Sequence, residues 1–199
     1  MIRAVAFDLM DTVVRDPYRE ALRAATGLEL DELFRRRPPH AYPALERDDL
    51  AEADYWASFA DHGIVVDPDA FHRTRLAGTT WLDGMDRLLD ELDGVVVRAT
   101  ASNYPRWIDG LATSLLAGRF DRVLASCHLG ARKPDAVFFH ALLDELDCRA
   151  DEVVFVDDRE ENVDGARQVG IPSHRYRDAA GVRDFLAEHG VLPTSVPRR

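Results

Sequence analysis

Short runs of apolar residues alternate along the chain with segments of helical periodicity. Four runs end in a polar cluster, which is typical of buried strands in a parallel sheet; they are Ala4–Phe7, Val95–Ala99, Val123–Ala125 and Val153–Val156. A weaker fifth run lies at Ser173–Tyr176. Between the runs, apolar residues three and four apart predict helices at Trp107–Leu116, Asp135–Leu146, Asn162–Val169 and Gly181–His189. This alternation predicts an α/β protein with a doubly wound parallel sheet.

One long segment interrupts the alternation directly after the first strand. Residues 15–80 contain no convincing strand and predict a small helical cap, with helices at Tyr18–Thr26, Asp31–Arg37, Ala44–Arg47 and Asp49–His62. We therefore expect a core made of residues 1–14 and 81–190, with residues 15–80 as the cap. Residues 191–199 contain two prolines and are expected to form an extended or partly disordered tail.

The charge balance excludes some classes of partner. The chain has 36 acidic and 25 basic residues, for a net charge of −11. Nucleic acids and anionic membranes bind clustered positive charge, so we expect neither as a partner. No apolar run approaches the roughly 18 residues of a membrane span, and two cysteines are too few for a disulfide framework. We expect a cytoplasmic monomer or homodimer that binds a small anionic ligand.

Polar residues that follow the predicted strands carry the candidate chemistry. In open parallel sheets, ligands bind beyond the carboxyl ends of the strands. Those positions hold Asp8, Met10, Asp11, Thr12, Ser102, Asn103, Lys133, Asp157 and Asp158. Lys133 is the only lysine among the 25 basic residues, which suggests a site where a guanidinium group will not serve.

Three carboxylates at one edge of the sheet would repel one another unless a cation lay among them. Oxygen ligands without a nearby cysteine or histidine pair favour Mg²⁺ over zinc. Each residue taken alone has a simpler interpretation as a helix cap, a turn or a solvated surface group. Their order along the chain, each at a strand end, favours a magnesium site over coincidence.

The order of these residues resembles the four motifs of the haloacid dehalogenase-like hydrolase superfamily. The segment Phe7–Thr12 is similar to the first motif, in which Asp-x-Asp-x-Thr follows an apolar strand. Ser102, Lys133 and the pair Asp157-Asp158 are similar to the second, third and fourth motifs. The predicted cap occupies the position of the cap in the superfamily's first subfamily. The resemblance implies a Rossmann-like core and covers nearly the whole chain.

Two finer resemblances concern branches of the superfamily. The spacing of Asp157, Asp158 and Asn162 is similar to that of the branch that holds glucose-1-phosphatases and the phosphatase domain of epoxide hydrolases. The residues from Met10 to Tyr18, together with 102–105, resemble plastid flavin mononucleotide hydrolases.

The resemblance implies a role for each candidate residue. Asp8 would attack phosphorus and form an aspartyl-phosphate, with Lys133 and Ser102 as further catalytic residues. The ligands of Mg²⁺ would be Asp8, the Met10 carbonyl and Asp158, supported by Asp157 and Asn162. The substrate would contact Asn103, Thr12 and Asp11.

One position departs from the phosphatase pattern. These phosphatases carry a second Asp, which protonates the leaving alkoxide, two residues after the nucleophile, where this chain has Met10. Asp11 would be a substitute, but it points away from the face shared by Asp8 and Met10 if the extended geometry persists. Three functions therefore remain open: a Mg²⁺-dependent phosphatase acting on a small phosphate ester such as flavin mononucleotide, a metal-independent haloacid dehalogenase, and a catalytically impaired protein that binds Mg²⁺ and a phosphorylated ligand.

Aromatic residues near the predicted site have two interpretations. Tyr42 and Trp56 in the cap would either stack on a ring of the substrate or pack the cap helices, and packing is the simpler interpretation. Tyr104 and Trp107 would either border the pocket or belong to the core. Cys127 is expected to be a buried core residue rather than a nucleophile.

Overall fold

A four-stranded parallel sheet forms the core of the computed structural model, which describes residues 1–193. Its order is β2-β1-β3-β4, with bounds β1 Ala4–Phe7, β2 Val97–Thr100, β3 Val153–Asp157 and β4 Ser173–Arg175. Ala4 pairs with Val97 on one side and with Val153 on the other. The chain crosses to opposite sides of β1 in successive connections, so the predicted doubly wound α/β architecture is confirmed.

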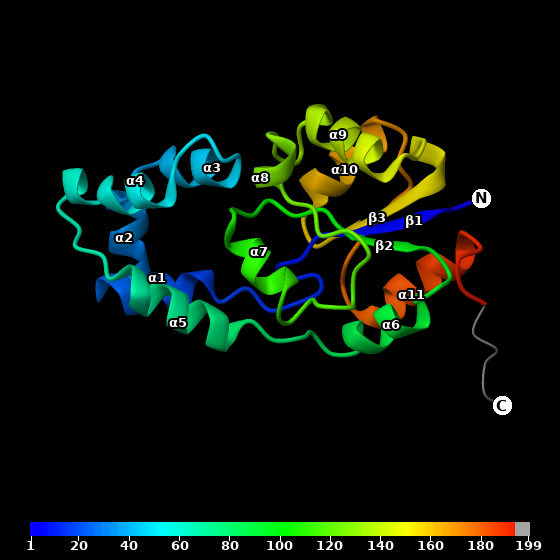
Figure 1. Ribbon diagram of the computed structural model, residues 1–199, viewed down its shortest axis with the longest axis horizontal. Helices are drawn as coiled ribbons and strands as arrows, with labels where there is room; N and C mark the ends of the chain where they lie inside the picture. Colours follow the sequence, from blue (N-terminus) through cyan, green and yellow to red (C-terminus); the bar gives the residue numbers. More distant parts are fainter. Residues whose placement is uncertain (194–199) are drawn as a thin grey trace.

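Helices cover both faces of this sheet (Figure 1). Side chains alternate along β1, so that Val5 and Phe7 pack into one apolar cluster and Ala4 and Ala6 into the other. The first cluster includes residues of α6 and α11, and the second includes residues of α9 and α10. The core helices are α6 Met85–Glu91, α7 Trp107–Ala112, α8 Ser126–Leu129, α9 Ala136–Leu146, η2 Ala150–Glu152, α10 Glu160–Gln168 and α11 Ala179–Glu188.

Most of the segment between β1 and β2, residues 18–78, forms a group of helices at one end of the molecule (Figure 1). These are α1 Tyr18–Thr26, α2 Leu30–Arg36, α3 Ala41–Glu46, α4 Glu52–Ala57, η1 Ala60–His62 and α5 Pro68–Gly78. The two linkers to the core run side by side, since Arg15 N donates to Thr80 O at 2.9 Å and Leu82 N donates to Val13 O at 3.0 Å. The cap boundaries that we propose, residues 15 and 80, fall in these paired linkers.

An aromatic cluster joins the cap to the core. Trp107 of α7 stacks on Trp56 of α4, with ring centroids 5.9 Å apart and an interplanar angle of 10°. Its ring also contacts Tyr42 and Phe71. Packing is therefore the main role of Trp56, as the simpler interpretation predicted, and Trp107 belongs to the core rather than to the cavity lining.

Several predicted elements differ in the structure. The predicted strand Val123–Ala125 makes only isolated bridges beside β2. The Thr100 hydroxyl donates to Leu124 O and accepts from Leu124 N–H, each at 2.8 Å, so these backbone groups do not pair with a strand. The helix expected at Trp107–Leu116 ends at Ala112, and the sequence did not predict α5, α6 or α8.

The expected tail also needs correction where it is described. Val191 and Leu192 are buried in the core, because both side chains are apolar, so the arm does not begin at residue 191. The rest of that prediction, residues 194–199, lies outside the described residues. In the part that is described, no helix has the length and apolar character needed to cross a membrane.

Candidate active site

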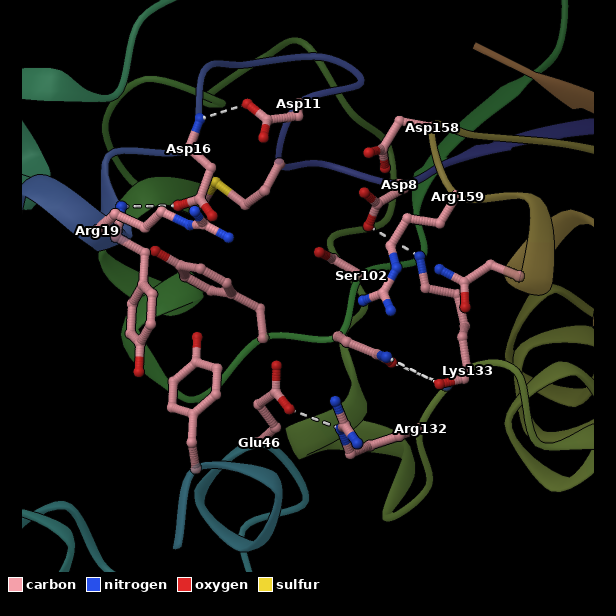
Figure 2. A pocket seen from close by; sticks show the side chains of 16 residues that line it. Asp8, Asp11, Asp16, Arg19, Glu46, Ser102, Arg132, Lys133, Asp158 and Arg159 are labelled. Carbon is pink, nitrogen blue, oxygen red and sulfur yellow. Dashed lines mark hydrogen bonds and ion pairs between the residues drawn. The ribbon is translucent and has the colours of Figure 1, made fainter. Parts of the chain in front are cut away.

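A cavity of about 350 Å³ opens at the carboxyl edge of the sheet, between core and cap (Figure 2). Asp8 follows β1, Ser102 follows β2 and Asp158 follows β3, so the parallel strands deliver all three to the same edge. The predicted residues that line the cavity are Asp8, Met10, Asp11, Ser102, Asn103, Lys133, Asp158 and Asn162. Thr12 and Asp157 lie behind this surface and are fully buried.

Lys133 joins two carboxylates at the base of the cavity. Its Nζ donates to Asp8 Oδ1 at 2.8 Å and to Asp157 Oδ2 at 2.6 Å, and its side chain is 1% exposed. Burial alone would lower the pKa of Lys133, but the two carboxylates raise it above its usual value. The ammonium is therefore charged and fixed beside the Asp8 carboxylate.

The acidic residues of the site fit a magnesium ion. Oxygen atoms of Asp8, Asp157 and Asp158 all lie within 4.8 Å of one another. Burial raises the pKa of Asp8 to about 7, against the opposing effect of Lys133, and burial together with Asp157 raises the pKa of Asp158 to about 6. A divalent cation would compensate this excess of buried negative charge, and carboxylate oxygens are ligands that Mg²⁺ prefers. Metal ligation by the Met10 carbonyl stays a prediction.

Two asparagines hold the charged groups in place. Asn162 Nδ2 donates to both carboxylate oxygens of Asp157 at 3.0 Å, which is the supporting position that the sequence predicted. The side chain of Asn103 pairs with the backbone of Lys133, accepting from its N–H at 2.8 Å and donating to its carbonyl at 2.9 Å. Asn103 therefore fixes the loop that carries the lysine, in addition to lining the cavity.

The predicted substrate contact of Thr12 is wrong. Its Oγ1 accepts a hydrogen bond from the backbone N–H of Asp158 at 3.1 Å, and the side chain has no exposed surface. This hydrogen bond links the segment after β1 to the segment after β3. Leu9 and Val13 on either side of Thr12 are also buried. Its role is to position the acidic loop.

Asp11 lies at the cavity, and its contact with the substrate stays a prediction. Asp8 and Met10 both line the cavity, while Leu9 between them is buried, so the alternation of β1 continues as far as Met10. At Asp11 the backbone turns to a φ of 57°, and the extended geometry ends. Asp11 consequently reaches the cavity rim, where its Oδ1 accepts from the backbone N–H of Asp16 at 2.9 Å.

A family model of haloacid dehalogenase-like hydrolases matches residues 2–170 of the chain. The chain belongs to the haloacid dehalogenase-like hydrolases. It is 29% identical to flavin mononucleotide hydrolase 1 of Arabidopsis thaliana, described as chloroplastic, over 195 residues that cover 96% of this chain and 79% of the relative.

Two solved structures show the same fold. A haloacid dehalogenase-family enzyme of Bacteroides thetaiotaomicron, crystallised with magnesium and inorganic phosphate, gives a TM-score of 0.71 at 16% identity, covering 90% of this chain and 96% of its own. The L-2-haloacid dehalogenase of Xanthobacter autotrophicus gives a TM-score of 0.65 at 19% identity, covering 97% of this chain and 85% of its own.

The cavity of the hydrolase has further lining residues to which the sequence assigned no role, which are Asp16, Tyr18, Arg19, Glu46, Arg132 and Arg159. Arg132 directly precedes Lys133, so its place at the site follows from the third motif. Glu46 ends a cap helix, and its sequence neighbours Arg47 and Asp48 make it indistinguishable from a solvated charge run. Only the fold of the cap reveals that Glu46 faces the core.

The contact between Glu46 and Arg132 connects the cap of the hydrolase to its core. Glu46 Oε2 lies 2.6 Å from Arg132 Nε, and the Glu46 side chain is 5% exposed. This contact is an ion pair without hydrogen-bond geometry, since neither atom has a hydrogen-bond partner within residues 1–193. Burial raises the pKa of Glu46 to about 7, with Arg132 opposing the rise.

Proposed function

We propose that this hydrolase is a Mg²⁺-dependent phosphatase that acts on a small phosphate monoester through an aspartyl-phosphate on Asp8. The observation that carries the proposal is the buried Lys133, which donates to Asp8 at 2.8 Å and to Asp157 at 2.6 Å beside a third carboxylate, Asp158. The ammonium, together with the Mg²⁺ that the acidic cluster would hold, would provide the positive charge that a phosphate dianion requires.

The residues of the chain have distinct tasks in this reaction. Asp8 attacks phosphorus, and the bond from phosphorus to the leaving oxygen breaks. Lys133 holds the attacking carboxylate ionised and neutralises one phosphate oxygen, while Ser102 at the end of β2 contacts another. A Mg²⁺ ion held by Asp8 and Asp158 would screen the repulsion between nucleophile and phosphate. Water then attacks the aspartyl-phosphate and releases inorganic phosphate.

We propose flavin mononucleotide as the substrate to test first. In support, a flavin mononucleotide hydrolase is 29% identical over 96% of the chain. The cavity of about 350 Å³ lies in the range of roughly 300–1,000 Å³ that small-molecule sites occupy. Tyr18, Tyr42 and Tyr104 line it together with Arg19, and aromatic and guanidinium groups are suited to contact a flat conjugated ring.

Met10 favours a second candidate function, hydrolytic dehalogenation. A halide leaves carbon without being protonated, so that reaction needs no acid at position 10. It also needs no metal, and it leaves the acidic pair Asp157 and Asp158 without a task. Asp157 accepts hydrogen bonds from Lys133, Asn162 and the backbone of Arg159, and these bonds hold the acidic loop in one conformation. For this reason, the phosphatase is the better supported function.

Hydrolysis of p-nitrophenyl phosphate and of flavin mononucleotide, with Mg²⁺ or with EDTA, tests the proposal. We expect phosphate release that requires Mg²⁺ and that Asp8→Asn abolishes. Chloroacetate serves as the test substrate for the alternative. Chloride release in EDTA, without activity on any phosphate ester, would show that the enzyme is a dehalogenase. No turnover in either assay, with retained binding of Mg²⁺ and phosphate, would show that it is a binding protein.

A further inference from the structure

The proposed reaction needs a proton donor that the nucleophile motif lacks. Met10 lies two residues after Asp8 and lines the same cavity, but a thioether has no proton to donate. An alkoxide is a strongly basic leaving group, and protonation by a positioned acid contributes roughly 10²–10⁴-fold to such reactions. Another acid that faces the leaving oxygen would replace the missing one.

The geometry of phosphoryl transfer says where that acid must lie. The attacking and leaving oxygens are roughly in line on opposite sides of phosphorus. A phosphoryl group held by Asp8, Lys133 and Ser102 on the core side therefore directs its leaving oxygen across the cavity, towards the cap. Figure 2 shows Glu46 on this opposite side, with its carboxylate pointing into the cavity.

Glu46 has the properties of a group prepared to hold a proton. It is buried, yet it lines the cavity, and its Oε2 forms an ion pair with Arg132 Nε at 2.6 Å. The end of its helix is fixed to the core, because Ser126 Oγ donates to the Glu46 carbonyl at 2.6 Å. Burial raises the pKa of the Glu46 carboxyl to about 7, so a large fraction is protonated at neutral pH.

The other cavity carboxylates on the cap side are less suited to this task. Asp11 is exposed, and its Oδ1 accepts from the backbone N–H of Asp16. Asp16 Oδ1 in turn accepts from the backbone N–H of Tyr18 at 2.9 Å. Both side chains hold the turn that precedes α1. Neither is as deeply buried as Glu46.

Building on the proposed phosphatase function, we propose that Glu46 of the cap is the general acid and base that replaces the missing Asp at Met10. As Asp8 attacks and the bond from phosphorus to the leaving oxygen breaks, the Glu46 carboxyl gives its proton to that oxygen and the alcohol departs. The Glu46 carboxylate then takes a proton from the water that attacks the aspartyl-phosphate. Phosphate leaves, and both carboxyl groups return to their starting states.

The charges around Glu46 set the pH dependence of this role. Arg132, Lys133 and Arg159 face it from the core and lower its pKa, whereas burial raises it. From the cap it is faced by Tyr18 and Tyr42, whose pKa values are raised by burial, so both are neutral in this range. Hydrolysis of an alkyl phosphate by the free enzyme should accordingly decline as the pH rises through about 7.

The test compares two substrates of similar size in the full-length enzyme with Mg²⁺. Benzyl phosphate has an alkoxide leaving group that needs a proton, whereas the leaving group of p-nitrophenyl phosphate hardly needs one. We expect Glu46→Gln to lower the ratio of kcat/KM for benzyl to p-nitrophenyl phosphate by about 100-fold or more. The matched control is Asp48→Asn, which removes the cap–core ion pair with Arg106 at 2.9 Å but lies outside the cavity lining. It should leave the ratio unchanged.

A second variant separates chemistry from cap positioning. In Met10→Asp/Glu46→Gln, a carboxyl group returns to the position that the family motif uses, so the ratio should recover at least tenfold over Glu46→Gln alone. An unchanged ratio in Glu46→Gln, or equal losses on both esters without recovery in the double variant, would overturn the role of Glu46 while leaving the phosphatase intact. If the wild type hydrolyses neither ester, the proposed function itself fails, and the inference fails with it.

Discussion

Replacing Lys133 by methionine removes the ammonium group but keeps an unbranched side chain of similar length. The wild-type Nζ lies 2.8 Å from Asp8 Oδ1 and 2.6 Å from Asp157 Oδ2, and the lysine side chain is 1% exposed. The variant therefore leaves two buried carboxylates close together without their shared cation. Loss of one partner from a buried ion pair costs about 3–5 kcal/mol.

Thermal unfolding followed by circular dichroism measures this cost. For a chain of this size about 2–4 °C of Tm corresponds to each kcal/mol, so Lys133→Met should melt roughly 6–20 °C below wild type in EDTA. Mg²⁺ should raise the Tm of the variant more than that of wild type, because the ion supplies the missing charge. Arg87→Met is the control, since the ion pair of Arg87 with Asp83 is exposed and its loss should leave the Tm nearly unchanged. A Lys133→Met protein that melts within a few degrees of wild type, with the same response to Mg²⁺, would refute this account of the site.

Three further variants test other parts of the structure. The pKa of Glu46 rises from 4.5 to about 7 on folding, so wild type loses up to roughly 3 kcal/mol of stability between about pH 4.5 and 7. Glu46→Gln has no carboxyl group to titrate at this position. Thermal melts at pH 5 and pH 8 should therefore show a smaller decline in stability with rising pH than in wild type, and equal declines would contradict the shift in the Glu46 pKa. Thr12→Val leaves the N–H of Asp158 without its acceptor and should raise the Mg²⁺ concentration for half-maximal hydrolysis about tenfold, whereas Thr12→Ser should not. Gly165→Ala places a Cβ 2.5 Å from a carbonyl oxygen of the loop that carries the lysine and should cost about 1–3 kcal/mol in urea unfolding. Gly110→Ala, in open space on α7, should be neutral or slightly stabilising, and an equal loss in both glycine variants would show that the close approach is unimportant.

Much of the site could be predicted because parallel strands bring their carboxyl ends to one edge of a sheet. Asp8, Ser102 and Asp158 each follow an apolar run that forms a strand, so their meeting follows from fold class alone, whereas Lys133 lies on the loop between α8 and α9. The supporting position of Asn162 is implied by the resemblance of its spacing after Asp157 and Asp158 to a branch of the superfamily, and its Nδ2 donates to Asp157 in the structure.

The remaining features depend on tertiary contacts that local pattern does not encode. The hydroxyl of Thr12 accepts from a backbone N–H 146 residues away in the sequence. Local sequence does not distinguish this role from a contact with the substrate. The segment around Leu124 has the composition of a strand, but the Thr100 side chain occupies its backbone groups. Glu46 carries no signal in the sequence, because its position depends on how the cap packs against α8 and Arg132.

Acid quenching during turnover tests the central claim, that Asp8 is a phosphorylated nucleophile, most directly. The enzyme is mixed with p-nitrophenyl phosphate and Mg²⁺, stopped in acid within one turnover, digested and examined by mass spectrometry. We predict one added phosphoryl group on the peptide that contains Asp8, lost when the quenched sample is treated with hydroxylamine and absent in Asp8→Asn. Turnover without a phosphorylated peptide, or a phosphoryl group on Ser102 instead, would contradict the proposed mechanism.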